Sequence, residues 1–406
     1  MKPFYYFILF SFLCFQLTAK DRKAVFIIID GVPAHQIERL HTPAIFDIAS
    51  KGAYGRAYTG GEIGWYSETA TISAIGYTNL LTSTWSNKHD VNGNSNLKPN
   101  YNYWSLFRIA KEQPKVYKTA IYSSWSDNRT VLLGEGKPET NHLKIDIAKD
   151  GYDQDTIHFP HKEKDLHIFD IDEKVSIEAA KSIREDAPDL SWVYLWYTDD
   201  AGHNEGNGAV FDEYVRKADK QIARIWESIK YRESHFDEEW MIVVTTDHGR
   251  TENGYSHGGQ SSCERTTWIS TNVPVNKYFR NENVAIIDIA PSICRFMGFS
   301  IPDPVLWEQD GIPFTGKVDI CDMETRTFDQ TVWLYWNCLS KNAEVTIYAA
   351  CDNKFKEGQQ DEWIKLDVVR ASKEKYQVDL NSLPSSKFYK FALVTPNNHL
   401  NRWLKK

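Results

Sequence analysis

The stretch Ala24-Val-Phe-Ile-Ile-Ile29, followed at once by Asp30 and Gly31, decides the fold that we predict for this chain. It is an unbroken apolar run rich in β-branched residues, which is typical of a strand buried on both faces. Residues 192–197 and 241–244 have the same character, and helical patterns lie between the runs, at residues 42–51, 103–112, 173–186 and 209–230. We therefore predict an α/β fold with a mostly parallel central sheet and helices on both faces.

The pattern changes after about residue 318. Short stretches with alternating apolar residues are then separated by polar turns, at residues 327–334, 343–350, 363–369, 376–380 and 388–394. Five such strands in a short region indicate a small C-terminal β-sandwich. We predict a large α/β domain over residues 20–318 and a small accessory domain over residues 319–406.

The N-terminus resembles a secretory signal. Lys2 precedes an apolar stretch over residues 4–17, and the small residue Ala19 follows it. This order is typical of a cleaved signal peptide, and the apolar part is short for a membrane span. We predict a signal peptide over residues 1–19, a secreted or periplasmic protein, and no transmembrane domain.

Composition excludes several classes of function. The 406 residues carry a formal net charge of −8, with 25% charged and 42% hydrophobic residues. This balance argues against nucleic-acid wrapping, which needs basic surfaces. Beyond residue 19 the chain has five cysteines and no CxxC pair, so a zinc–thiolate site is excluded. An odd number of cysteines leaves at least one unpaired within the chain.

Each of the three apolar runs is followed by acidic residues. Asp30 follows the first, Asp199 and His203 follow the second, and Asp247 and His248 follow the third, with His257 nine residues further on. Because ligands of such sheets gather at the carboxyl ends of the strands, we expect these side chains to meet. Clustered carboxylates need a cation or raised pKa values, and mixed imidazole and carboxylate ligands favour zinc as the cation. Three Asp and three His residues divide into two sites for divalent metal ions. The other nine histidines, His35 among them, are interpreted as surface residues.

A metal pair that cleaves phosphoesters needs a nucleophile. Residues 66–76 offer hydroxyl groups just before a predicted helix that runs to about residue 81. A hydroxyl at a helix N-terminus lies where backbone N–H groups favour phosphate oxygens, although helix capping explains such residues equally well. The residues alone do not choose among the four candidates, Ser67, Thr69, Thr71 and Ser73.

Taken in order, these residues resemble the alkaline-phosphatase superfamily over roughly residues 24–315. Within it the chain is most similar to nucleotide pyrophosphatase/phosphodiesterases and to the ethanolamine-phosphate transferases of GPI-anchor synthesis. The resemblance implies one zinc ion on Asp30, Asp247 and His248, and a second on Asp199, His203 and His257. The close spacing of His257 to His248 departs from many diesterases.

The resemblance also implies a nucleophile and a phosphate-binding asparagine. Thr71 has the spacing of the transferase branch and would bridge the metals and attack phosphorus, with Thr69 as the next choice. The spacing of the diesterase branch falls nearer Ser73. Asn94 matches the asparagine that donates to a phosphoryl oxygen, with Asn92 in reserve.

We therefore expect a secreted, metal-dependent phosphodiesterase or nucleotide pyrophosphatase with a phospho-threonine intermediate. Its substrate would be a small phosphoester such as a nucleotide, a phospholipid head group or a sugar phosphate. The alternatives are a phosphomonoesterase, a phosphoethanolamine-type transferase, and a glycan- or surface-binding protein with an inactive catalytic domain. A sulfatase is disfavoured because the C-x-P-x-R motif is absent from the sequence. A monoesterase would need extra cations, and the candidates are interpreted as solvated surface charges: Lys88, Arg129 and Arg250.

Overall fold

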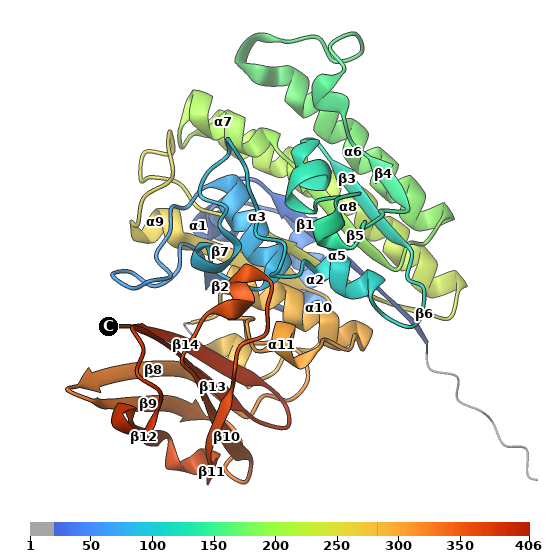
Figure 1. The fold of residues 1–406 in the computed structure, drawn as a ribbon. Helices are drawn as coiled ribbons and strands as arrows, with labels where there is room; N and C mark the ends of the chain where they lie inside the picture. The colour runs from blue at the N-terminus through green and yellow to red at the C-terminus, as the bar shows by residue number, and fades with distance from the viewer. Residues whose placement is uncertain (1–19, 282) are drawn as a thin grey trace, which may run out of the picture.

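The computed structural model describes residues 20–281 and 283–406. The predicted signal peptide, residues 1–19, lies outside the described residues, so that prediction remains a prediction. Figure 1 shows an α/β body that carries smaller sheets formed by the C-terminal part of the chain.

The central sheet has seven strands in the order β2-β7-β6-β1-β5-β3-β4. Strand β7 runs antiparallel to both of its neighbours, and the other neighbouring pairs are parallel. The prediction of a mostly parallel sheet is confirmed. The strands are β1 (Asp21–Ile29), β2 (Ala53–Tyr58), β3 (Thr119–Ser123), β4 (Ile147–Lys149), β5 (Leu190–Leu195), β6 (Glu238–Thr245) and β7 (Thr266–Thr271).

Strand β1 lies in the middle of the sheet, and its side chains alternate between two cores. Val25 and Ile27 pack in the core formed with α2, α6 and α8, whereas Phe26 and Ile28 pack in the core formed with α3, α5 and α10. Helices therefore cover both faces, as predicted. The helices are α1 (Ala34–Arg39), α2 (Pro43–Lys51), α3 (Ser73–Thr82), α4 (Ser86–His89), α5 (Leu106–Lys111), α6 (Leu166–Glu185), α7 (Tyr197–Glu205), α8 (Ala209–His235), α9 (Ser262–Arg265), α10 (Ile289–Met297) and α11 (Asp303–Leu306).

The C-terminal region forms two antiparallel sheets, with the strand orders β11-β10-β13-β14 and β12-β9-β8. The prediction of a C-terminal region built from short strands is confirmed, and the five predicted strands correspond to β9–β13. The sequence patterns missed β8 and β14. The strands are β8 (Ile320–Phe328), β9 (Thr331–Cys338), β10 (Glu344–Ala350), β11 (Ile364–Arg370), β12 (Lys375–Asp379), β13 (Phe388–Val394) and β14 (His399–Lys405).

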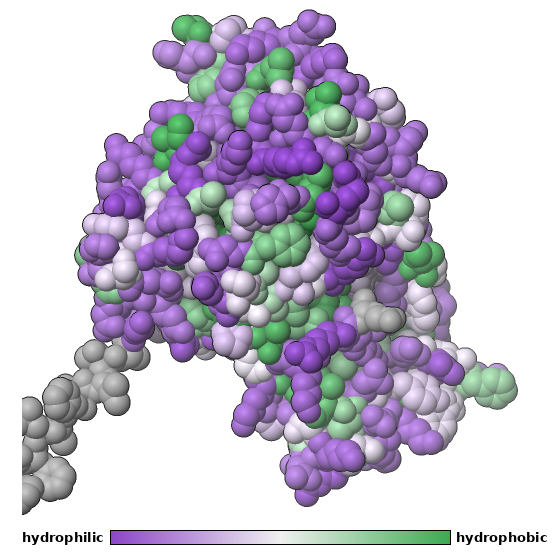
Figure 2. Space-filling model, turned by 180° about the vertical axis from the view of Figure 1, so that it is seen from behind, coloured by the Kyte–Doolittle hydropathy of each residue, from purple (hydrophilic) through white to green (hydrophobic). Residues whose placement is uncertain are grey.

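Among the described residues, none of the helices combines the length and the apolar character needed to cross a bilayer. Figure 2 shows that the face seen from behind is mainly hydrophilic, with smaller apolar groups between the polar side chains. The five cysteines beyond residue 19 are all free thiols in this structure.

Three histidines that were expected at the surface, His89, His167 and His399, are buried, so that interpretation is wrong for them. His89 at the end of α4 accepts a hydrogen bond from Val91 N at its Nδ1 (3.1 Å), and its Nε2 lies 2.8 Å from Asn79 Oδ1. Burial lowers the pKa of His89 to about 3. Burial also lowers the pKa of His399 to about 4, although its Nε2 donates to a backbone carbonyl.

The low pKa values of His89 and His399 predict that the protein loses stability in acid. The unfolded chain takes up protons below about pH 6.5 and the folded chain does not, so the free energy of unfolding falls as pH drops towards 4. Between pH 6.5 and 5 each of these histidines should lower the free energy of unfolding by about 2 kcal/mol. Urea titrations at pH 7 and pH 5 should show this decrease to be about 2 kcal/mol smaller in His89→Gln. The exposed His158→Gln is the control, and an unchanged pH dependence in His89→Gln would contradict the prediction.

Candidate active site and metal centre

Asp30 follows the last residue of β1 and is fully buried. Its Oδ2 accepts hydrogen bonds from two phenols, Tyr194 at 2.7 Å and Tyr77. Its Oδ1 has no hydrogen-bond partner among the described residues. The next residue, Gly31, has a φ of +65°, and a Cβ atom there would lie 2.6 Å from Asp199 Oδ1. Glycine is therefore required for the chain to turn here and leave room for the second carboxylate.

Asp247 and His248 lie just beyond β6 and are fully buried. The Nε2 atom of His248 is 3.2 Å from Asp247 Oδ2 and 3.4 Å from Asp30 Oδ1. Its Nδ1 lies 2.9 Å from the carbonyl of Gly249, so Nδ1 carries the hydrogen and Nε2 presents a lone pair. Asp247 Oδ1 accepts from Gly31 N, whereas its Oδ2 has no hydrogen-bond partner in the described part of the chain. Two unpartnered carboxylate oxygens thus face one imidazole lone pair.

A second group forms beside the first. Asp199 and His203 lie on α7, and Asp199 Oδ2 is 3.2 Å from His203 Nε2. His257, in the segment between β6 and α9, places its Nε2 3.6 Å from Asp199 Oδ1 and 3.1 Å from His203 Nε2. Both imidazoles donate from Nδ1 to backbone carbonyls, of Tyr255 (2.8 Å) and Thr71 (2.9 Å). The two Nε2 atoms therefore approach each other with lone pairs rather than hydrogens.

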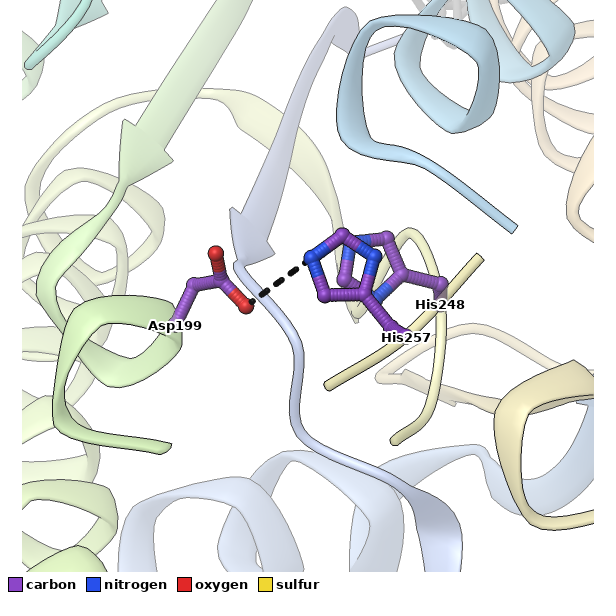
Figure 3. A group of neighbouring side chains, drawn as sticks. All are labelled: Asp199, His248 and His257. Atoms are coloured by element: carbon purple, nitrogen blue, oxygen red, sulfur yellow. Dashed lines mark ion pairs between the residues drawn. The ribbon is translucent and has the colours of Figure 1, made fainter. Parts of the chain in front are cut away.

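The two groups are adjacent. Figure 3 shows His248 and His257 lying one over the other, with Asp199 directed at them, and the ring centroids of the two histidines are 3.8 Å apart. The structure thus brings all six predicted ligands to one edge of the sheet. Asp30, Asp247 and His248 lie close enough together to hold one ion, and Asp199, His248 and His257 to hold another. His203, which was expected in the second set, lies within 3.2 Å of both Asp199 and His257.

Several carboxylates are buried close together in the site, which favours the binding of cations. Burial raises the pKa of Asp30 to about 7, and the Asp199 carboxylate adds to the rise. Burial also raises the pKa of Asp247 well above its ordinary value, and burial lowers the pKa of His248 well below its own. Burial opposes the charge of Asp199, but its contacts with His203 and His257 and the positive charge of Arg250 hold its pKa well below the usual range. Together with the unpartnered carboxylate oxygens, this donor set fits dications.

The structure distinguishes between two candidate hydroxyls. Ser73, the first residue of α3, places its Oγ 3.2 Å from His248 Nε2. Thr71 instead donates to Gly259 O at 2.9 Å and accepts from Gly258 N at 3.0 Å. The Ser73 hydroxyl faces the ligand group of Asp30, Asp247 and His248, whereas the Thr71 hydroxyl ties its own segment to the backbone around residues 258–259. The choice of Thr71 from the sequence stays a prediction, and this geometry favours Ser73.

The surroundings of α3 explain how Ser73 reaches the ligands. A Cβ atom at Gly76 would lie 2.8 Å from Asp247 Cβ and from its carbonyl oxygen, so glycine allows the helix to approach closely. Asn94 Oδ1 accepts from Ala74 N at 2.9 Å, which places this exposed amide at the start of α3. Asn92, the reserve candidate, donates to Asp90 O instead. Thr69 and Ser67 are engaged with segment 60–62 through Thr69 N and Ser67 Oγ.

Sequence reasoning missed three residues beside the ligands: Tyr77, Tyr194 and Arg250. Arg250 was interpreted as a surface charge, which is wrong: it is fully buried, pairs with Asp199, and donates from Nε to Gly254 O at 2.6 Å. Its position directly after Asp247-His248-Gly249 was a usable signal. Tyr194 stands next to the end of β5, and Tyr77 is one helical turn after Ser73. Their hydroxyls could have been suspected from those positions.

Fold and site together define an enzyme of the alkaline-phosphatase superfamily. Residues 24–287 match the family described as type I phosphodiesterase / nucleotide pyrophosphatase. The chain belongs to this family, whose members are metal-dependent and act on phosphoesters.

Individual relatives are more distant. GPI ethanolamine phosphate transferase 2 of Schizosaccharomyces pombe is 30% identical over 120 residues, which cover 26% of this chain and 16% of that protein. The chain thus spans about a sixth of that relative's length. A 2-O GAG sulfatase has a similar fold, with a TM-score of 0.50, 12% identity and coverage of 89% of this chain and 86% of that chain. Human ectonucleotide pyrophosphatase / phosphodiesterase 5 has a TM-score of 0.49 and 10% identity, with coverage of 73% and 97%.

Proposed function

We propose that this protein is a two-metal phosphodiesterase or nucleotide pyrophosphatase that attacks phosphorus with the Ser73 hydroxyl. One observation carries the proposal: a hydroxyl at the N-terminus of α3 and two unpartnered carboxylate oxygens surround His248 Nε2. Asp30, Asp247 and His248 would hold one dication, and Asp199, His203 and His257 the other. Bound there, zinc ions would neutralise phosphoryl oxygens and the developing charges of the attacking and leaving groups.

Other residues of the chain would carry out the attack on phosphorus, bind the phosphoryl oxygens and orient a metal ligand. Ser73 Oγ forms a bond to phosphorus while the bond to the leaving alcohol breaks, and the proton of the Ser73 hydroxyl ends on that alcohol. The other substituent of the diester stays on phosphorus in the Ser73 adduct, and water later cleaves the bond between Ser73 Oγ and phosphorus, which restores the hydroxyl and releases a monoester. Because Asn94 Oδ1 is used by Ala74 N, its Nδ2 is the atom left to donate to a phosphoryl oxygen. The first turn of α3 adds backbone N–H groups oriented towards negative charge. Thr71 holds its segment against Gly258 and Gly259, and its carbonyl orients His257.

The positions of three cations support a diester substrate over a monoester. A dianionic monoester needs an extra positive group, and Lys88, Arg129 and Arg250 were the candidates. Lys88 is bound to Asp310, Arg129 to Glu135 and Asp150, and Arg250 to Asp199. Each is therefore committed to a carboxylate of the protein. The export of the enzyme remains a prediction from residues 1–19.

Paired assays test this proposal. We expect the zinc-loaded full-length protein to hydrolyse bis-p-nitrophenyl phosphate with a kcat/KM about tenfold or more above that for p-nitrophenyl phosphate. The second negative charge of a monoester, if no cation of the protein faces it, should raise the free energy of the transition state by roughly 1.4 kcal/mol or more, which corresponds to a tenfold lower kcat/KM. Dialysis against a chelator should abolish both activities, and zinc should restore them. Faster cleavage of the monoester would assign a phosphomonoesterase, and no cleavage of either compound by the metal-loaded protein would contradict the proposal.

A transferase remains the second candidate because of the similarity to GPI ethanolamine phosphate transferase 2. Adding an alcohol acceptor to the diester assay distinguishes the two functions. A hydrolase should release its phosphoryl product to water even when the alcohol is abundant. A transferase should instead transfer the phosphoryl group mainly to the alcohol. The fraction of phosphorylated alcohol among the products should then exceed the mole fraction of the alcohol in the solvent.

A further inference from the structure

We propose that Tyr77 and Tyr194 are positioning residues that restrict Asp30 to a single metal-binding oxygen. The inference rests on the proposed metal site and concerns residues that do not themselves bind metal. Tyr194 OH lies 2.7 Å from Asp30 Oδ2, Tyr77 OH hydrogen-bonds the same oxygen, and the two phenolic oxygens are 2.8 Å apart.

The number of phenolic protons determines which of these contacts are hydrogen bonds to Asp30. Three oxygen–oxygen contacts share only two phenolic protons, since each tyrosine has one. A carboxylate is a stronger acceptor than a phenol, so both protons are directed to Asp30 Oδ2. Oδ2 is then occupied by two donors, and Oδ1, which has no partner among the described residues, is left facing His248 Nε2 at 3.4 Å. Asp30 can therefore offer one oxygen to an ion but not two.

The two tyrosines come from different elements on either side of Asp30. Tyr194 lies on β5 beside β1, where it pairs in register with Ile28. Tyr77 lies on α3, four residues after Ser73, so both side chains project from one face of that helix. One of them contacts His248 and the other Asp30. Tyr77 thus fixes the distance between the helix that carries the proposed nucleophile and the strand that carries a proposed ligand.

The rings are held independently of their hydroxyls. Tyr77 is fully buried and makes edge contacts with Trp125 and Trp192, at centroid distances of 6.3 and 6.2 Å. Tyr194 is also buried, and its ring centroid lies 4.9 Å from that of Tyr77. A phenylalanine at either position keeps this packing, so each substitution removes only a hydroxyl, with its hydrogen bond to Asp30 and its contact with the other phenol.

The experiment measures zinc binding directly, by competition with a chromogenic chelator, on the full chain. We expect two binding steps in the unsubstituted protein. In Tyr77→Phe and in Tyr194→Phe one step should weaken by about 10- to 100-fold, the usual effect of removing a group that orients a ligand. The other step, at Asp199, His203 and His257, should keep its affinity. The double variant should weaken the same step further.

Tyr103→Phe is the matched control. Tyr103 is buried and its hydroxyl has no hydrogen-bond partner among the described residues, so this variant loses a phenolic hydroxyl that holds no ligand. Its two zinc affinities should be unchanged. Thermal unfolding of the metal-free proteins identifies any variant that fails to fold, in which case the other single variant decides.

The outcomes separate this inference from the proposed function. If the unsubstituted protein binds two zinc ions and both phenylalanine variants bind them equally well, the positioning role is overturned and the metal site stands. Equal weakening of both steps would also overturn it, because the tyrosines contact only Asp30 among the six proposed ligands. If the unsubstituted protein binds no zinc, the proposed metal site fails, and the inference fails with it.

Discussion

Ser73→Ala should lower kcat for bis-p-nitrophenyl phosphate by about 10³-fold or more, because an activated nucleophile has no substitute in its site. Thr71→Val should have a much smaller effect, at most about 10²-fold, the scale expected when a catalytic group is slightly displaced. The reason is geometric: Ser73 Oγ lies 3.2 Å from His248 Nε2, whereas Thr71 Oγ1 bonds the backbone of Gly258 and Gly259. Steady-state rates of the zinc-loaded proteins provide the comparison.

Two controls sharpen this prediction. Ser73→Thr keeps a hydroxyl at the same position and should retain far more activity than Ser73→Ala. Rapid quenching of the unsubstituted enzyme with bis-p-nitrophenyl phosphate, followed by peptide mass spectrometry, should place a p-nitrophenyl phosphoryl group on Ser73. The reverse result, an inactive Thr71→Val with an active Ser73→Ala, would restore Thr71 as the nucleophile.

The sheet and the convergence of the proposed ligands were predicted from the sequence through one local rule. Apolar runs that end in acidic residues predict buried parallel strands, and parallel strands deliver their carboxyl ends to one edge, so Asp30, Asp199 and Asp247 meet there. That inference needs neighbouring strands but no knowledge of the loops. The short distances from β6 to Asp247 and His248, and from β5 to α7, leave little freedom for those side chains.

The nucleophile could not be chosen in the same way because it depends on where a helix begins. Thr71 lies before α3 and Ser73 is the first residue of that helix, and their hydroxyls have different partners. Gly76, whose missing side chain lets α3 approach Asp247, determines that placement through a tertiary contact. A sequence pattern carries the spacing of the hydroxyls, but not the point at which the helix starts relative to the sheet.

Buried charges were not predicted from the sequence, and Lys88 is the clearest case. A lysine between polar residues on a short helix predicts a surface position, yet its side chain is fully buried. Its Nζ donates to Asp310 Oδ1 at 2.7 Å, to Glu308 O at 2.7 Å and to Asn401 Oδ1 at 2.8 Å. Asn401 lies on β14, so this lysine joins α4 to the C-terminal sheets. The partners come from residues more than 200 positions away, and no local pattern reveals them.

Lys88→Met should therefore lower the free energy of unfolding by about 3–5 kcal/mol, because it leaves the largely buried carboxylate of Asp310 without its cation. Lys356→Met is the matched control. Lys356 also joins the C-terminal region to the segment around α4, through Asp90 at 2.6 Å, but this pair is partly exposed and should contribute less than about 1 kcal/mol. Urea titrations at pH 7 measure both variants. Equal losses would contradict the prediction, because the burial of Lys88 is the only reason to expect a larger effect. A selective loss would mean that the buried pair of Lys88 and Asp310 holds α4 in place, and with it the start of the segment that leads to Asn94.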